Sequence, residues 1–154
     1  MELMDYLTTE LILTGIDAAN AEEAIRTVAQ TLYAAGYVKA SYADAVLARE
    51  TTFPTGIEND GYNFAIPHTD SGHVNKPAIA IATLRHPVEF SRMDAENETT
   101  DVRLIFMLAI TEPDKQIGAL RSLMQLLQDH QFYNDLCQCS TPDAMFALIQ
   151  KKVF

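Results

Sequence analysis

The sequence predicts an α/β domain in which helices cover both faces of a β-sheet. Three short apolar runs, at residues 64–66, 78–84 and 102–110, have the length and composition of buried strands. The segments around them repeat apolar residues at helical spacing, and strands separated by helices are typical of layered α/β domains. The chain has 154 residues, the size of one domain, and contains neither a repeat nor a linker-like stretch. We therefore expect a single domain over residues 1–154.

The region before the first apolar run is expected to contain two helices. Residues 17–20 are of the helix-starting type, and apolar residues then recur at helical spacing through 24–33. A second helix is expected from Ser41, with Asp44 three residues later as a short-armed version of a capping box. The stretch 51–63 that follows is rich in Pro, Gly and Asn, which predicts turns and loops.

The apolar runs and two prolines organise the rest of the chain. The run at 78–84 is apolar on both faces, which predicts a central strand, and residues 88–90 are interpreted as its extension or as a further strand. A strand is expected at 102–110. Pro113 is then expected in the first turn of a helix and Pro142 at the first position of the last helix, because proline is favoured there.

Charge and cysteine content limit the partners and the compartment. The net charge is −10 and the isoelectric point about 4.6, so nucleic acid and anionic membrane surfaces would repel the chain. This charge is compatible with a basic protein partner, and equally with a charge that only keeps the domain soluble. No apolar run is long enough to span a membrane, and the first residues lack the pattern of a signal peptide. Cys137 and Cys139 form no disulfide framework, which predicts free thiols in a cytoplasmic protein.

His68 is the histidine in the most suggestive position. It follows the apolar run 64–66 and Pro67, so it is expected in the loop that leaves a buried strand. In open α/β sheets, ligands and chemistry sit at loops that leave the carboxyl ends of strands. His86 and His130 have no such setting and are expected to be solvated.

The sequence leaves a metal site open beside His68. His68, Asp70 and His73 supply three potential ligands within six residues, although their spacing matches no zinc signature. The carboxylate of Asp70 could instead orient the ring of His68 or flank it together with His73. A GxSxG nucleophile elbow and the glycine-rich loops of nucleotide-binding kinases do not occur in the sequence.

A nucleophilic histidine is the remaining interpretation. A neutral imidazole attacks phosphorus well near neutral pH, and its phosphorylated form is a labile phosphoryl donor. Such a site needs a positioned ring and positive charge or amide donors for the phosphoryl oxygens. Arg49 is a candidate phosphate clamp, or else a surface ion-pair residue, because sequence spacing does not place it near His68.

Several motifs resemble the enzyme IIA components of the sugar phosphotransferase system, in the fructose–mannitol superfamily that also contains a nitrogen-regulatory branch. The motifs are "LARETTFPTGI", "FAIPHTD", "LIFMLAI" and "EPDKQIGALRSLMQLL". The family pattern has an Arg-Glu pair, a Thr-Gly-Ile turn and an Ile-Pro-His strand end, which match 49–50, 55–57 and 66–68 in order. The likeness covers almost the entire chain, and the sequence around Arg49 and Gln116 is similar to that of the galactitol-type branch.

The resemblance implies a fold, a reaction and a set of partners. The family fold is a mixed, mostly parallel five-stranded sheet with helices on both faces. The small carrier protein HPr would phosphorylate His68 on Nε2, with Arg49 beside the site. A cysteine of the IIB component would accept the group, before sugar phosphorylation coupled to transport through the membrane component IIC. The resemblance implies no cofactor, no bound metal, no nucleic acid and no direct insertion into the membrane.

Three further positions have two interpretations each. Gln116 stands where many family members have a second histidine, so its amide could donate a hydrogen bond to phospho-His68 from a helix N-terminus, or it is a solvated first-turn residue. Thr55 and Gly56 could present a hydroxyl and an amide to the phosphoryl group as a phosphate-binding loop. Alternatively they form a simple turn in which Gly56 has a positive φ angle.

The sequence is also compatible with two rival functions. In one, a regulatory protein of the same fold uses phospho-His68 as a signal to a partner. In the other, His68, Asp70 and His73 form a metal-binding or small-ligand module. Phe53 and Tyr62 are candidates for contacts with HPr and IIB, whereas the sequence names neither the sugar or polyol nor the oligomeric state.

Overall fold

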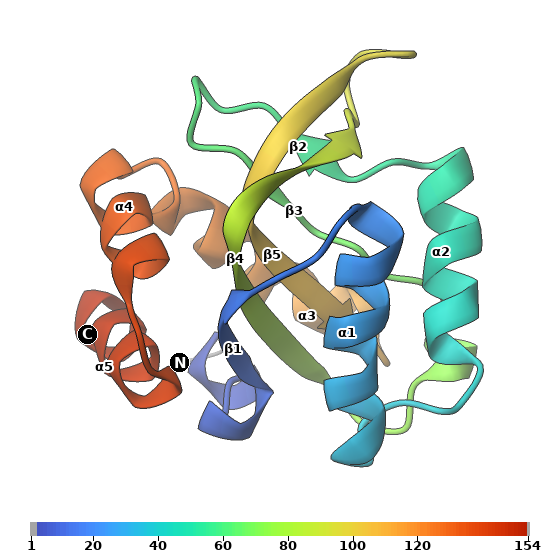
Figure 1. Cartoon of the computed structure of the whole chain (residues 1–154). Helices are drawn as coiled ribbons and strands as arrows, with labels where there is room; N and C mark the ends of the chain where they lie inside the picture. Colours follow the sequence, from blue (N-terminus) through green and yellow to red (C-terminus); the bar gives the residue numbers. More distant parts are fainter. Residues whose placement is uncertain (1–2, 154) are drawn as a thin grey trace.

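A five-stranded mixed sheet with the order β1-β4-β5-β3-β2 forms the centre of the computed structural model, which describes residues 3–153 (Figure 1). β1 pairs with β4 and β3 with β5 in parallel, whereas β4 with β5 and β2 with β3 are antiparallel. The α/β class and the mixed sheet are therefore confirmed, but the prediction of a mostly parallel sheet is wrong. The reason is that the two longest strands follow each other in the chain and pair as a hairpin. The strands are β1 (Ile12–Ile16), β2 (Gly56–Ile57), β3 (Phe64–Ala65), β4 (Ala78–Ser91) and β5 (Thr99–Ala109).

The helices within residues 3–153 largely follow the sequence pattern. They are α1 (Ala21–Ala34), α2 (Tyr42–Thr52), α3 (Pro113–Leu126), α4 (His130–Gln138) and α5 (Pro142–Val153), with short 3₁₀ turns at Met4–Tyr6, Thr9–Leu11 and Ser71–His73. Pro113 and Pro142 open α3 and α5 as predicted, whereas α4, β1 and β2 were not predicted. None of these helices is long and apolar enough to cross a lipid bilayer.

The two predicted helix starts behave differently. The side chain of Asn20 accepts a hydrogen bond from the first turn of α1, as its residue type predicts. Ser41 precedes α2 but makes no side-chain cap bond, and its Oγ lies 2.8 Å from Nδ1 of His73 instead. The carboxylate of Asp44 accepts a hydrogen bond from Nη1 of Arg26 at 3.1 Å. The predicted capping box is therefore wrong, because contacts with distant segments occupy both side chains.

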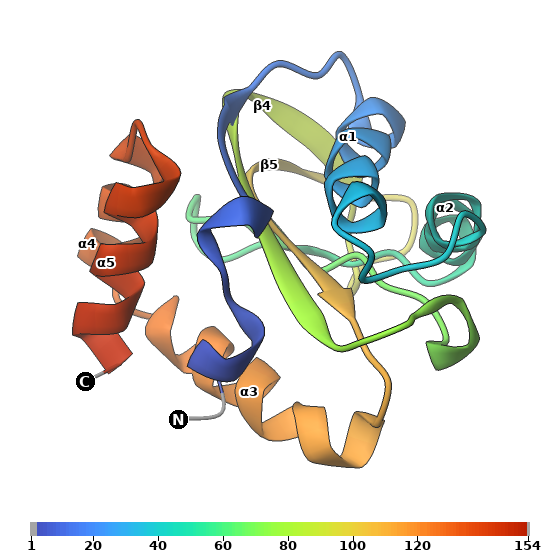
Figure 2. The same cartoon turned by 90° about the horizontal axis from the view of Figure 1, so that it is seen from below.

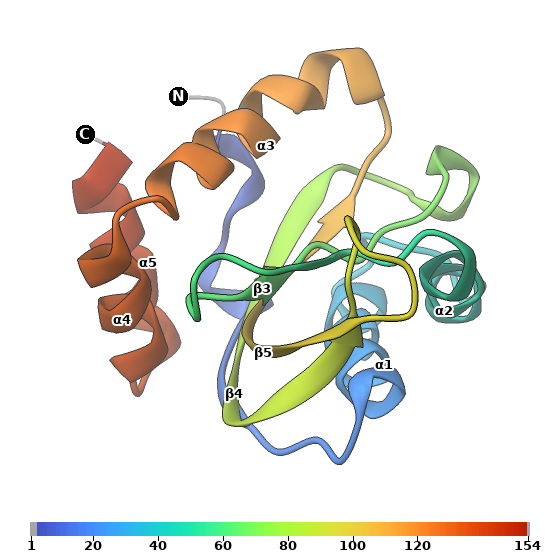
Figure 3. The same cartoon turned by 90° about the horizontal axis from the view of Figure 1, so that it is seen from above.

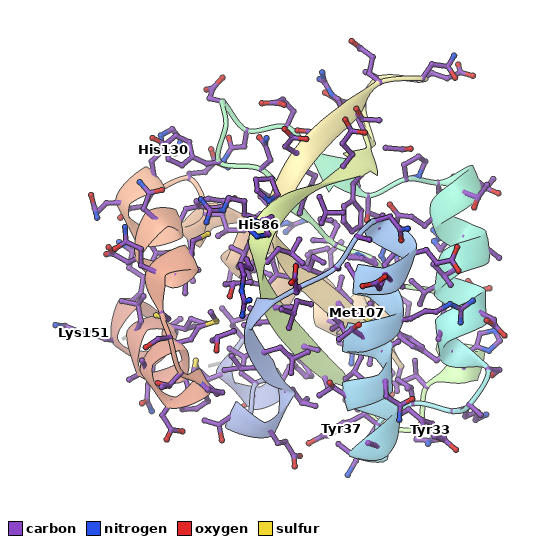
Figure 4. The ribbon with its side chains drawn as sticks, in the orientation of Figure 1. Tyr33, Tyr37, His86, Met107, His130 and Lys151 are labelled. Carbon is purple, nitrogen blue, oxygen red and sulfur yellow. The ribbon has the colours of Figure 1, made fainter. Side chains whose placement is uncertain are left out.

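Two apolar layers enclose the sheet, and each uses alternate residues of the strands. α1 and α2 pack with small residues of β4 such as Ala80 and with Met107 of β5, which lies behind α1 in Figure 4. α3, α4 and α5 pack with the intervening residues, among them Ile81 and Phe106. Figures 2 and 3 show α4 and α5 stacked together on the side of the sheet away from α1 and α2.

The segment after β3 is fixed between β5 and α2. Beyond the last residue of β3, the amide of Leu108 donates to the carbonyl of Pro67 at 3.1 Å, and His68 forms a bridge with Leu108. The fully buried hydroxyl of Tyr42, at the start of α2, donates to the carbonyl of Leu108 at 2.7 Å. Since β3 and β5 are parallel, the loop that carries His68 leaves the sheet where β5 also ends.

Candidate active site

The ring of His68 is half-buried and held by its own backbone segment. Nδ1 lies 2.8 Å from the carbonyl oxygen of Ile66. A carbonyl oxygen only accepts hydrogen bonds, so Nδ1 must carry the hydrogen. In the neutral ring, Nε2 is then unprotonated and has a free lone pair. The geometry thus supplies a nucleophilic nitrogen of defined identity.

Arg49, on α2, reaches the loop that carries His68. Its Nη1 lies 3.9 Å from Oδ1 of Asp70, two residues after His68, and its guanidinium carbon lies 5.1 Å from the centre of the Phe53 ring. Within residues 3–153, the buried Nε of Arg49 has no hydrogen-bond partner. The carboxylate of Asp70 is 84% exposed, so this long ion pair contributes little to stability, about 0–1 kcal/mol. The ion pair with Asp70 therefore holds Arg49 near His68 only weakly, and another anion could replace the carboxylate.

Glu50, at the end of α2, and Thr55 are joined by two hydrogen bonds. The hydroxyl of Thr55 donates to one carboxylate oxygen of Glu50 and its amide donates to the other, both at 2.9 Å. Burial raises the pKa of Glu50, and the two bonds from Thr55 partly oppose this rise. Thr55 itself is buried. The amide and the hydroxyl of Thr55 are both donated to Glu50, and a contact from them to the phosphoryl group remains a prediction.

Gly56 is a site of close backbone approach rather than a turn. It begins β2 and is not among the glycines with positive φ. A Cβ atom at this position would lie 2.6 Å from the carbonyl oxygen of Ser91, closer than real Cβ contacts. The prediction of a positive φ angle at Gly56 is therefore wrong, and glycine is required here because β2 lies against the end of β4.

Gln116 holds the start of α3. Its Oε1 accepts from the amides of Thr111 and Glu112 at 2.9 and 3.2 Å, and its Nε2 donates to the hydroxyl of Thr111 at 3.4 Å. This side chain is half-buried, so it is not simply a solvated first-turn residue. A hydrogen bond from its amide to phospho-His68 remains a prediction.

The metal alternative has no support in the described part of the chain. There, no three His, Cys, Asp or Glu side chains come together in a way that could hold a metal ion. His73 faces Ser41, and Asp70 points toward Arg49. The prediction of a ligand set made of His68, Asp70 and His73 is therefore wrong, because the loop directs these side chains to separate neighbours.

The two aromatic residues suggested for docking differ in accessibility. Phe53 is 60% exposed beside Arg49. Tyr62 stacks on His130 with ring centres 3.8 Å apart and meets Tyr133 edge to face, so it belongs to the packing around α4. His130, labelled in Figure 4, was expected to be solvated; it is partly buried, and one face of its ring stacks on Tyr62.

The sequence matches one protein-family model over almost its whole length. The model, described as "Phosphoenolpyruvate-dependent sugar phosphotransferase system, EIIA 2", covers residues 5–152. The chain belongs to this EIIA type-2 family. It is therefore a phosphoryl carrier of the phosphotransferase system for sugar uptake.

Named relatives and solved structures agree with this assignment. The galactitol-specific EIIA component of Escherichia coli K12 is 30% identical over 122 residues, which are 79% of this chain and 81% of that protein. The crystal structure of the mannitol IIA of E. coli has a TM-score of 0.76 and 29% identity, and the match covers 93% of this chain and 98% of the other. A complex of E. coli mannitol IIA with its phosphorylated IIB has a TM-score of 0.77 and 27% identity, over 94% and 97% of the chains.

Proposed function

We propose that His68 accepts a phosphoryl group on Nε2 from phospho-HPr and passes it to a cysteine of a IIB component during uptake of galactitol or a similar polyol. The observation that supports this most directly is the bond from Nδ1 to the carbonyl of Ile66. It leaves Nε2 unprotonated before the reaction, so no base is needed to activate the ring.

Both transfer steps balance with the groups named. In the first, the Nε2 lone pair of His68 forms a bond to phosphorus as the bond from phosphorus to the donor histidine breaks, and the electron pair returns to the donor ring. In the second, a cysteine thiolate attacks phosphorus and the electron pair of the Nε2–phosphorus bond returns to His68. Nδ1 keeps its hydrogen in both steps, so the bond to Ile66 holds the ring throughout.

Arg49 is proposed to stabilise the phosphoryl group. The group brings negative charge next to a guanidinium that already faces the loop through Asp70. We expect Arg49 to exchange the exposed carboxylate for phosphoryl oxygens, which it can bind through two nitrogens at once. Stacking on Phe53 limits how far the guanidinium can move.

The partners and the location follow from the proposed reaction. HPr and IIB would act in the cytoplasm, and the membrane component IIC would be reached only indirectly. The complex of a related IIA with phosphorylated IIB supports a IIB partner, and the galactitol-specific relatives support the polyol class. Exposed Phe53, beside Arg49, is proposed to contact one of these partners.

Phosphorylation in a reconstituted system tests this function. We expect the chain, incubated with phosphoenolpyruvate, enzyme I and HPr, to gain the mass of one phosphoryl group. H68A should gain none, whereas H86A, which alters an exposed histidine of β4 (Figure 4), should react like the wild type. R49A should react about 100-fold more slowly.

A galactitol-type IIB should then remove the phosphoryl group from the wild type, and a phosphoprotein that stays stable in the presence of IIB would favour the regulatory role instead. Phosphorylated H68A, or an unreactive wild type, would refute the proposal.

A further inference from the structure

We propose that Glu50 is a positioning residue that fixes the proton position and orientation of the His68 ring through Thr55 and the backbone of Ile66. Glu50 forms its hydrogen bonds with Thr55 rather than with the His68 ring. A chain of contacts connects it to His68, and each contact can be followed in the structure. The effect on phosphoryl transfer rests on the function proposed above, whereas the effect on the ring does not.

The first contact is the pair between Glu50 and Thr55. A carboxylate accepts at both oxygens, and here one oxygen receives the hydroxyl and the other the amide of Thr55. An amide side chain at position 50 could accept only one of these bonds, because its nitrogen end is a donor. The site therefore requires a carboxylate, although burial of Glu50 disfavours the charged form.

The second contact joins Thr55 to the strand that leads to His68. The carbonyl of Thr55 accepts from the amide of Ile66 at 3.4 Å, next to the antiparallel pairs of Gly56 with Ala65 and of Ile57 with Phe64. β2 has only these two residues, so its own ladder holds it weakly. The position of Thr55 therefore contributes directly to the position of Ile66.

The opposite side of β2 is held by the tip of the β4–β5 hairpin. The carbonyl of Gly56 accepts from the amide of Met93 at 2.8 Å, and Gly56 forms a bridge with Arg92. β2 thus lies between the hairpin and β3, and Glu50 holds Thr55, the residue just before the first residue of β2. The hairpin backbone lies close to Gly56 on this side, since a Cβ atom there would be 2.6 Å from the carbonyl oxygen of Ser91, so it hinders movement of β2 away from β3.

The last contact is the hydrogen bond from the His68 ring to the backbone of Ile66, which determines which ring nitrogen carries the hydrogen. The carbonyl of Ile66 is the acceptor for Nδ1 at 2.8 Å. If this carbonyl turns away, the hydrogen is no longer confined to Nδ1, and part of the molecules will carry it on Nε2 instead. Those molecules lack the lone pair that attacks phosphorus, so the reactive fraction falls.

The chain provides a control in Glu58, which has the same two kinds of hydrogen-bond donor but is exposed where Glu50 is half-buried. Like Glu50, this residue accepts one threonine hydroxyl, from Thr100 at 2.7 Å, and one backbone amide, from Gly61 at 3.2 Å. It follows β2 rather than preceding it, on the side away from the contact between Thr55 and Ile66. E50Q and E58Q thus make the same chemical change at the two ends of one strand.

Nitrogen NMR of protein labelled with ¹⁵N-histidine tests the proposal without any partner. In the wild type we expect the His68 signals of a ring protonated only at Nδ1. In E50Q and in T55V they should move toward averaged values, whereas E58Q and T55S, which keeps the hydroxyl, should give wild-type signals. Phosphorylation by HPr should slow about three- to tenfold in E50Q and remain unchanged in E58Q, as expected for one lost hydrogen bond.

Each outcome decides between positioning and a general structural role. Circular dichroism first identifies the variants that fold, and T55V provides the test if E50Q does not. Wild-type ring signals in folded E50Q or T55V would overturn the proposal, and so would equal changes in E50Q and E58Q. Changed ring signals in a chain that HPr fails to phosphorylate would support the positioning role and refute the proposed function.

Discussion

Gly56 and Gly72 allow a sharp test of how tightly β2 is held. At Gly56 a Cβ atom would lie 2.6 Å from the backbone oxygen of Ser91 and 3.1 Å from Cβ of Phe90. At Gly72, in the loop after His68, no such atom among the described residues lies within 4 Å of the added carbon. Neither glycine has a positive φ angle, so replacement by alanine strains neither backbone conformation directly.

The two substitutions differ mainly in this one contact. Each alanine lowers the entropy of the unfolded chain by a similar amount, which stabilises the protein by about 0.4–1 kcal/mol and cancels in the comparison. Only G56A must push two backbones apart, because its added Cβ atom would lie 2.6 Å from the carbonyl oxygen of Ser91, well inside the 3.4 Å at which ordinary contact begins. Overpacking of this kind costs about 1–3 kcal/mol. We therefore expect G56A to be less stable than G72A by about 1–3 kcal/mol.

Urea unfolding of the two variants and the wild type measures this difference. Equal slopes against urea would show that the free energies of unfolding can be compared. G72A should equal or exceed the stability of the wild type. If the free energies of G56A and G72A differ by less than about 0.5 kcal/mol, the hairpin does not clamp β2 and the description of Gly56 is refuted.

Three further substitutions test other contacts of the site. Y42F should lower the free energy of unfolding by about 0.5–1.5 kcal/mol, because the hydrogen bond from the buried Tyr42 hydroxyl to the carbonyl of Leu108 is lost, and an unchanged free energy in urea unfolding would contradict this. E50Q should gain stability relative to the wild type as the pH rises. Burial raises the pKa of the Glu50 carboxyl above its ordinary value of 4.5, so the folded wild type binds the carboxyl proton more tightly than the unfolded chain does. The free energy of unfolding of the wild type therefore falls as the pH rises from 4.5 through the raised pKa, whereas glutamine at position 50 has no such proton. Unfolding measured over this range should show the difference, and a constant offset would refute it. Q116A should speed hydrogen exchange of the amides of Thr111 and Glu112, which lose their acceptor, and unchanged exchange would contradict the role of Gln116 in holding the start of α3.

Much of the fold follows from local patterns. The long apolar runs became β4 and β5, and Pro113 and Pro142 opened the helices in which they were expected. β1 was missed because its partner β4 lies far along the chain, and only that pairing makes a strand of residues 12–16. β2 was missed for a similar reason, since two residues carry no pattern of their own.

The sequence indicated candidate site residues but not the geometry between them. The Ile-Pro-His motif indicated His68, whereas the hydrogen on Nδ1 depends on the direction of the Ile66 carbonyl. The capping role predicted for Ser41 is wrong, because folding brings its hydroxyl to His73, which is distant in the sequence.

The position of the phosphorus atom on the ring tests the central claim most directly. Protein labelled with ¹⁵N-histidine would be phosphorylated with phosphoenolpyruvate, enzyme I and HPr and examined by long-range proton–nitrogen NMR. The account predicts a phosphorus-coupled Nε2 on His68 and a hydrogen retained on Nδ1. Phosphorus on Nδ1 of His68, or on any other residue, would contradict it.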